Sequence, residues 1–168
     1  RRKDISLLQP YQLLAQSDLY ACYLTEGFHQ REEWGVWSAG RYARMMIVTD
    51  LPNFSEFEAH ITLEVTVINE ILESSPVLQI IVDDRIVGYV MFRKNLKKAQ
   101  KVSFYCDISK TNFGIDFHLT YSDAPSNLGR STDHRELGFG VMAFTAAFSP
   151  KGGGRADESA LDVGFWGV

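Results

Sequence analysis

The stretch His60-Ile-Thr-Leu-Glu-Val-Thr-Val67 alternates polar and apolar residues at every step. Successive side chains of a β-strand point to opposite faces, so the four apolar residues share one face and the four polar residues share the other. The apolar set is Ile61, Leu63, Val65 and Val67. An amphipathic helix would instead need apolar residues three and four positions apart. The stretch therefore predicts a strand over residues 57–67, with one face buried and the other in water.

A second decisive stretch follows at Val77-Leu-Gln-Ile-Ile-Val-Asp-Asp-Arg-Ile-Val-Gly-Tyr-Val-Met-Phe92. Two runs rich in β-branched residues are interrupted only by Asp83-Asp84-Arg85. Asp is a common turn residue because its short polar side chain tolerates a left-handed backbone. The sequence predicts a β-hairpin with a tight turn at these three residues.

Short runs of the same kind recur along most of the chain and are separated by turn residues. Such a succession is typical of sandwiches and jelly rolls. The sequence therefore predicts an all-β fold, an antiparallel and jelly-roll-like β-sandwich of about eight strands. The expected strands cover residues 18–25, 43–49, 57–67, 77–82, 86–92, 101–106, 114–121 and 137–148.

The 168 residues suit one domain. Residues 1–17 are expected to be a lead-in segment with one helical turn, and residues 18–150 to be the sandwich. Residues 151–168 open with Gly152-Gly-Gly154, which predicts a flexible linker and then an extension outside the domain. A chain that starts at Arg1 without a methionine is interpreted as a domain cut from a larger protein.

Charge and hydropathy narrow the range of partners. The formal net charge is −4, the pI is near 5.5, and basic residues are scattered, which argues against a nucleic-acid partner. The basic run at 93–98 is interpreted as a solvated hairpin loop rather than an anion site. Because no apolar run reaches the roughly 18 residues that span a bilayer, no direct membrane insertion is expected.

The two cysteines, Cys22 and Cys106, each lie in an apolar, strand-like run. Neither belongs to a CxxC motif or a Cys/His cluster, so zinc is not expected. Buried free thiols are favoured over a disulfide, because a disulfide would require the two strands to be adjacent. No metal and no cofactor is expected.

The segment Glu26-Gly-Phe-His-Gln-Arg-Glu-Glu-Trp-Gly-Val-Trp-Ser-Ala-Gly40 gathers two tryptophans, an acidic pair and a histidine. Aromatic faces stack on sugar rings, while carboxylates hydrogen-bond sugar hydroxyls. Two tryptophans three residues apart would lie on opposite sides of an extended segment, so at least one is expected in the core. The expected ligand contacts are His29, Glu33, Trp34 and, from a later segment, Arg135; Trp37, Ser38 and Asp133 are expected to shape the loop.

A second polar segment, residues 127–138, holds Asp133 and Arg135 two positions apart. Two interpretations remain open. Either Arg135 and Asp133 contact the ligand, or they pair with Glu33 or Glu26 and hold this loop against the tryptophan segment.

These segments carry a family resemblance. The stretch Gly27-Phe-His-Gln-Arg-Glu-Glu-Trp-Gly-Val-Trp-Ser38 resembles the G-[FW]-x(3)-E-x-W-G-x-W-[ST] signature of an accessory domain attached to bacterial glycosyltransferases and phosphoglycerol transferases. Leu51-Pro52 and Leu128–Gly140 resemble later blocks of that domain in the same order. The resemblance spans residues 18–148, and both Glu32 and Glu33 are candidates for the signature's acid. It implies a β-sandwich, a non-catalytic role and a cell-envelope polysaccharide context.

The sequence contains no GxSxG, HExxH, P-loop or dinucleotide-binding glycine pattern. The four histidines are scattered along the chain. An enzymatic alternative is that the carboxylates of Glu33 and Asp133 form the acid pair of a glycosidase. The favoured function is a non-catalytic module that holds a glycan near a catalytic domain of the same or a neighbouring chain. The alternative is a structural or protein-interaction domain that docks onto such a neighbour, and exposure of Trp34 would favour the glycan.

Overall fold

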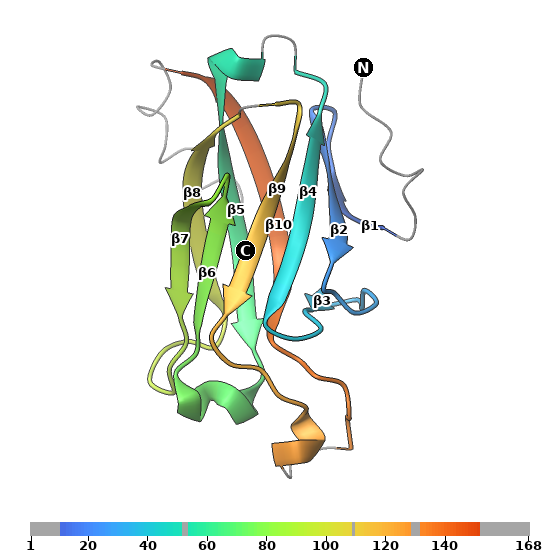
Figure 1. Cartoon of the computed structure of the whole chain (residues 1–168), viewed down its shortest axis with the longest axis vertical. Helices are drawn as coiled ribbons and strands as arrows, with labels where there is room; N and C mark the ends of the chain where they lie inside the picture. The colour runs from blue at the N-terminus through green and yellow to red at the C-terminus, as the bar shows by residue number, and fades with distance from the viewer. Residues whose placement is uncertain (1–10, 52–53, 109, 129–131, 152–168) are drawn as a thin grey trace.

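The computed structural model describes residues 11–51, 54–108, 110–128 and 132–151 (Figure 1). Most of the predicted lead-in, and all of the predicted tail after Lys151, lie outside these residues. Within them the chain forms ten strands and three short 3-10 helices, and no helix there is long and apolar enough to cross a membrane. The strands are β1 (Gln12–Gln16), β2 (Tyr20–Glu26), β3 (Val36–Trp37), β4 (Tyr42–Thr49), β5 (Phe57–Val67), β6 (Val77–Val82), β7 (Arg85–Met91), β8 (Gln100–Asp107), β9 (Asn112–Leu119) and β10 (Phe139–Pro150). The 3-10 helices are η2 (Phe54–Glu56), η3 (Asn69–Ser74) and η4 (Pro125–Leu128).

The strands form two antiparallel sheets that face each other. One has six strands in the order β1-β2-β4-β9-β6-β7, and the other has four in the order β3-β10-β5-β8. The apolar side chains between them form one core, in which Phe117 and Phe139 meet from opposite sheets with ring centroids 5.1 Å apart. The predicted all-β antiparallel sandwich is confirmed.

The structure adds two strands to the eight that were predicted. Strand β1 lies inside the expected lead-in, where it pairs with β2 and is interrupted by a bulge between Leu13 and Ala15. The bulge breaks the period of two, which explains why the sequence showed no strand pattern there. Strand β3 has two residues, too short for any periodicity to show.

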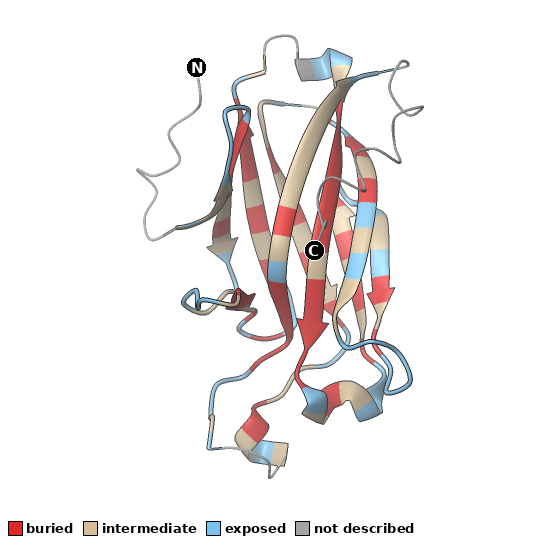
Figure 2. Cartoon of the chain, turned by 180° about the vertical axis from the view of Figure 1, so that it is seen from behind, coloured by how far each residue is buried: buried red, intermediate tan, exposed pale blue. Residues whose placement is uncertain are grey.

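Strand β5 confirms the predicted alternation on its inner face and corrects the prediction for its outer face. Ile61, Leu63, Val65 and Val67 are fully buried. The outward His60 and Thr62 are also buried, at 2% and 1% exposure, so the outer face is not uniformly wet (Figure 2). Strand β5 lies between β10 and β8, and β8 covers these side chains: Tyr105 stacks on His60, and Ser103 hydrogen-bonds Thr62.

The hairpin of β6 and β7 forms as predicted, with a turn of two residues rather than three. Asp83 and Asp84 have φ angles of 50° and 60°, the left-handed conformation that a type I′ turn requires at both central positions. Arg85 is already the first residue of β7.

Both cysteines are buried and free, as predicted. Cys22 lies on β2 and Cys106 on β8, so they belong to different sheets. Burial raises the pKa of the Cys106 thiol to about 12 and raises the pKa of Cys22 further. Both thiols therefore stay protonated and poorly nucleophilic at neutral pH.

Candidate functional site

The tryptophan segment between β2 and β4 turns back on itself at Glu32–Gly35. The backbone N–H of Glu32 donates to the carbonyl of Gly35 at 2.8 Å, and the N–H of Gly35 donates back at 3.3 Å. Gly35 has φ 152°, and a Cβ there would lie 2.2 Å from the Val141 carbonyl oxygen. Only glycine fits this turn.

The turn brings Trp34 and Trp37 together. Their ring centroids are 4.7 Å apart, and both rings are half-buried. A Cβ on Gly140 of β10 would lie 2.8 Å from Cη2 of Trp34 and 3.0 Å from Cζ3 of Trp37, so both rings lie directly over this glycine. The prediction that the two rings lie on opposite sides is wrong, because the segment is not extended through Trp34.

Ser38 is fully buried. Its Oγ donates to the carbonyl of Gly40 at 2.8 Å and accepts the backbone N–H of Phe139 at 3.0 Å. These bonds use the hydroxyl to join the segment before β4 to the start of β10, which is a shaping role.

Arg135 forms the ion pair that was one of the two predictions for it, with a different acidic partner. Because this ion pair links the loop of Arg135 to the tryptophan segment, we call it the staple. Its Nε and Nη2 donate to the two carboxylate oxygens of Asp133 at 3.0 and 2.7 Å, and its Nη1 lies 3.5 Å from Oε2 of Glu32. The Arg135 guanidinium lowers the pKa of the Asp133 carboxyl to about 2. The expected partner was Glu33 or Glu26, and a single sequence does not show which member of the acidic pair the turn presents to Arg135.

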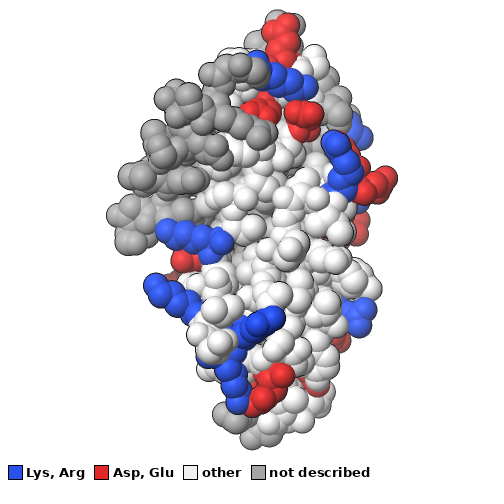
Figure 3. Space-filling view, turned by 90° about the vertical axis from the view of Figure 1, so that its left-hand side faces the viewer, with Lys and Arg blue, Asp and Glu red and all other residues white. Residues whose placement is uncertain are grey.

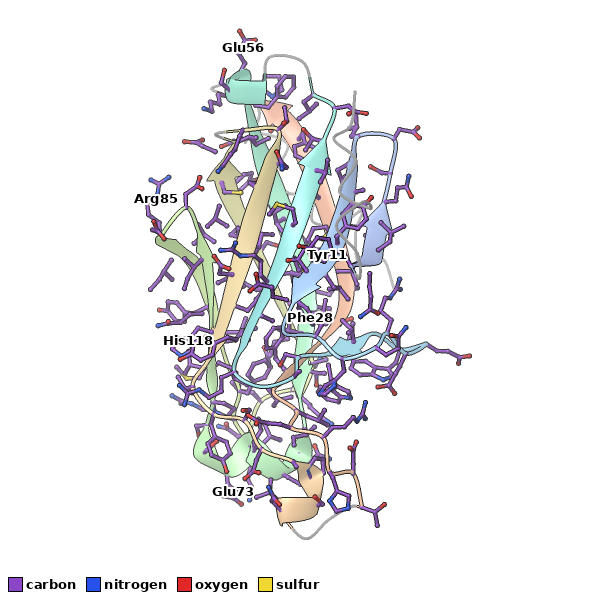
Figure 4. The ribbon with its side chains drawn as sticks, turned by 45° about the vertical axis from the view of Figure 1, so that its right-hand side comes forward. Tyr11, Phe28, Glu56, Glu73, Arg85 and His118 are labelled. Atoms are coloured by element: carbon purple, nitrogen blue, oxygen red, sulfur yellow. The ribbon has the colours of Figure 1, made fainter. Side chains whose placement is uncertain are left out.

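The remaining predicted residues lie around this staple. The Nε2 atom of His29 is 2.8 Å from the backbone oxygen of Glu136, next to Arg135, while Glu33 is exposed in the turn. Figure 4 labels Phe28, which precedes this histidine and packs edge-to-face on Phe139. The structure thus gathers the predicted residues into one loop cluster, and their contact with a ligand stays a prediction.

A second surface, which the sequence reasoning missed, lies on the outer face of the six-stranded sheet. Tyr42 and Arg44 of β4 pair in register with His118 and Asp116 of β9. Their intervening neighbours point inward and are buried, among them Ala43 and Phe117. The four polar and aromatic side chains therefore point away from the core, as Figure 4 shows for His118.

Tyr42 and His118 form an exposed aromatic pair. Their rings are stacked with centroids 4.6 Å apart and an interplanar angle of 11°, while Tyr42 remains 60% exposed. The Arg41 guanidinium lies over the Tyr42 ring at 5.4 Å from its centroid and donates to its hydroxyl at 3.0 Å. The stack fixes the orientation of two rings in contact with water.

Arg44 and Asp116 form a two-pronged ion pair beside this stack. Nε and Nη2 of Arg44 donate to the two carboxylate oxygens at 2.6 and 3.1 Å. The side chains are 43% and 39% exposed, so each keeps hydrogen-bonding capacity toward solvent.

The row of Tyr42 and His118 continues over two more strands. Gln79 of β6 is opposite His118, and Tyr89 of β7, 65% exposed, is opposite Gln79. Neighbouring strands lie about 4.8 Å apart, so Tyr42 and Tyr89 are about 14 Å apart across the sheet. An open groove of about 400 Å³ follows the β4–β9 part of this surface, and its lining includes Glu26, Tyr42, Arg44, Ile81, Asp116 and His118.

The signal for this face was present in β9. In Asn112-Phe-Gly-Ile-Asp-Phe-His-Leu119 every second residue is a large apolar one, so the other positions had to face outward. What one sequence does not show is that β4 and β6 flank β9, and this order alone places Tyr42 and Gln79 beside His118.

The face combines the groups that recognise polyols: aromatic rings, a guanidinium, a carboxylate and an amide. The charges of Arg44 and Asp116 are already paired with each other, which suits a neutral ligand better than an ionic one. Among the residues that the structure describes, no three His, Cys, Asp or Glu side chains are grouped to hold a metal ion.

No protein-family model matches the sequence, and no curated protein is similar to it. Several solved structures resemble its fold. The C-terminal domain of EclA, titled a sugar-binding protein, has 11% identity and a TM-score of 0.45 over 83% of this chain and 84% of that one. A xylan-binding module, CBM15, has 12% identity and a TM-score of 0.43 over 83% and 97%. A family 35 carbohydrate-binding module from an environmental isolate has 10% identity and a TM-score of 0.40 over 75% and 78%. With TM-scores below 0.5, these likenesses carry no argument about this chain's ligand.

Proposed function

We propose that this domain is a non-catalytic glycan-binding module and that it holds its glycan on the outer face of the six-stranded sheet. The observation that supports this most is the Tyr42–His118 stack, an aromatic pair held in register across two strands while Tyr42 stays 60% exposed. An aromatic side chain with no core to fill gains most from a partner that covers it.

The surroundings of the stack favour a sugar. Sugar rings have apolar C–H faces that pack on aromatic rings and hydroxyls that need both donors and acceptors. The groove offers the donors of Arg44, the acceptors of Asp116 and, in the adjoining row, the amide of Gln79. The row from Tyr42 to Tyr89 crosses the strands over about 14 Å, which suits an extended oligosaccharide laid across the sheet.

The loop cluster borders this face through Glu136. The side chain of Glu136 lines a shallow depression with Gly40 and Tyr42, and its backbone oxygen contacts His29. A glycan on the sheet face would therefore reach the segment that carries Arg135. We propose the predicted loop residues as secondary contacts at this end, and the cell-envelope polysaccharide context as the setting that the signature of residues 27–38 suggests.

The second candidate is a docking domain that binds a neighbouring catalytic domain. The observation in its favour is the exposed apolar surface on the same sheet, where Ile86 and Tyr89 are 57% and 65% exposed. A protein partner would cover this surface without any sugar.

Affinity electrophoresis tests the two candidates directly. The chain is run through gels containing one of a panel of bacterial glucans and surface polysaccharides, alongside Tyr42→Ala and the control Leu19→Ala. Leu19 is 50% exposed in the turn between β1 and β2, away from the groove. We expect at least one polysaccharide to retard the native chain and Leu19→Ala, and to lose that effect on folded Tyr42→Ala. Equal migration of all three in every gel would favour the docking domain.

A further inference from the structure

The basic residues of the chain are unevenly distributed. Residues 85–106 hold six of its 17 basic residues and no acidic residue. The rest of the chain holds 11 basic and 21 acidic residues, a formal charge of −10. A strongly positive region on an acidic chain points to an anionic partner, because the charge segregation favours one orientation of approach.

The positive charge is concentrated in the loop between β7 and β8, which we call the basic loop. Its basic residues Arg93, Lys94, Lys97 and Lys98 are all exposed. Figure 3 faces this edge of the molecule and shows basic side chains gathered in its lower half. Lys94 pairs with Glu73 of η3, and within the part of the chain that the structure describes the other three cations of the loop form no ion pair.

An exposed leucine stands in the middle of these cations. Leu96 is 45% exposed, in a turn closed by its backbone N–H donating to the carbonyl of Arg93 at 3.1 Å. The two lysines that follow it flank it on the C-terminal side. A soluble polyanion would pair with the cations but would not bury the leucine. The interface of a lipid bilayer takes up both, the leucine among the acyl chains and the cations at the phosphate groups.

We propose that the basic loop binds the anionic surface of a lipid bilayer, with its lysines on the phosphate groups and Leu96 in the interface. This is peripheral attachment and needs no spanning segment. The proposal is independent of the glycan, because the residues that carry it lie outside the groove on the six-stranded sheet.

Co-sedimentation with vesicles tests the proposal. We expect the chain to sediment with phosphatidylcholine vesicles that contain phosphatidylglycerol, to remain in the supernatant with phosphatidylcholine alone, and to be released by high salt. Each cation near the surface contributes about a fivefold factor, so Lys97→Gln with Lys98→Gln should lower binding about 25-fold.

Two further variants make the test specific. Lys110→Gln with Lys151→Gln removes the same charge from exposed positions outside the loop and should lower binding much less. Leu96→Ser keeps every charge and should weaken binding to anionic vesicles without changing retention on dextran sulfate. No binding to anionic vesicles, an equal loss in both double variants, or vesicle binding indifferent to Leu96→Ser would each overturn the proposal.

Discussion

Gly140 is the residue on which the position of the tryptophan pair depends. Replacing it with alanine places a Cβ 2.8 Å from a ring atom of Trp34 and 3.0 Å from a ring atom of Trp37, so the two packed rings would have to move. We expect Gly140→Ala to lower the free energy of unfolding by about 1–3 kcal/mol, since overpacking forces side chains off their rotamers. Urea denaturation followed by tryptophan fluorescence measures this.

Gly88→Ala is the matched control, because its Cβ would meet Val102 at 3.5 Å, an ordinary contact. Its stability should stay close to that of the native chain. If Gly88→Ala and Gly140→Ala lost the same stability, the loss would come from strand glycines in general and not from the ring contacts.

Asp133 provides a prediction about pH. Hydrogen bonds from Arg135 lower the pKa of its carboxyl to about 2 in the folded chain. A depressed pKa means that the stabilisation is present above the unfolded pKa near 3.8 and is lost as the pH falls through about 2. We expect an NMR titration of the Asp133 carboxyl carbon to have its midpoint near 2. In Arg135→Gln the midpoint should rise toward the ordinary value without reaching it, because the backbone N–H of residue 135 still donates to the carboxylate. A midpoint unchanged by that substitution would show that Arg135 is not the cause.

Sequence reasoning went furthest for residues whose role follows from their own segment. It offered an ion pair that holds the loop as one of two roles for Arg135 and Asp133, and it named Ser38 as a shaping residue, which its two backbone hydrogen bonds support. It did not find Tyr42 or His118. Their two rings stack only because β4 and β9, about 70 residues apart in the chain, are neighbours in the sheet.

Among the elements, the conformation of the β6–β7 turn follows directly from its two central residues, although glycine would fit the second position better than the aspartate there. Both Asp83 and Asp84 have positive φ angles. This conformation is higher in free energy for a residue with a Cβ than for glycine. We expect Asp84→Gly to raise the free energy of unfolding by about 0.5–1 kcal/mol, because Asp-Gly is a preferred pair in a type I′ turn. Thermal unfolding measures the effect, with Asp84→Val as the destabilised comparison. A destabilised Asp84→Gly would mean that the carboxylate itself holds the turn.

The strands that the sequence predicted are those with a clear period and a length of six or more residues. β5 and β6 have the predicted bounds, and β9 and β10 differ from them by two residues at each end. β1 and β3 were missed because a bulge interrupts one and two residues make up the other. The sequence also did not predict that the outward side chains of β5 are buried, because their burial depends on the side chains that β8 places beside them.

In the whole molecule, the two sheets separate three regions of different chemistry. The core between them is apolar, the outer face of the six-stranded sheet carries the aromatic and ionic row, and the basic loop lies at the β7–β8 edge. The two proposed ligands, a glycan and a lipid surface, therefore bind to different parts of the same domain.

The most direct test of the glycan site is a two-dimensional amide NMR titration with an oligosaccharide from the polysaccharide that best retards the chain. The glycan site proposed here predicts saturable shifts concentrated at Tyr42, Arg44, Asp116 and His118, and their loss in Tyr42→Ala. Shifts concentrated instead at Trp34, Trp37 and Arg135, with the sheet face unchanged, would contradict it.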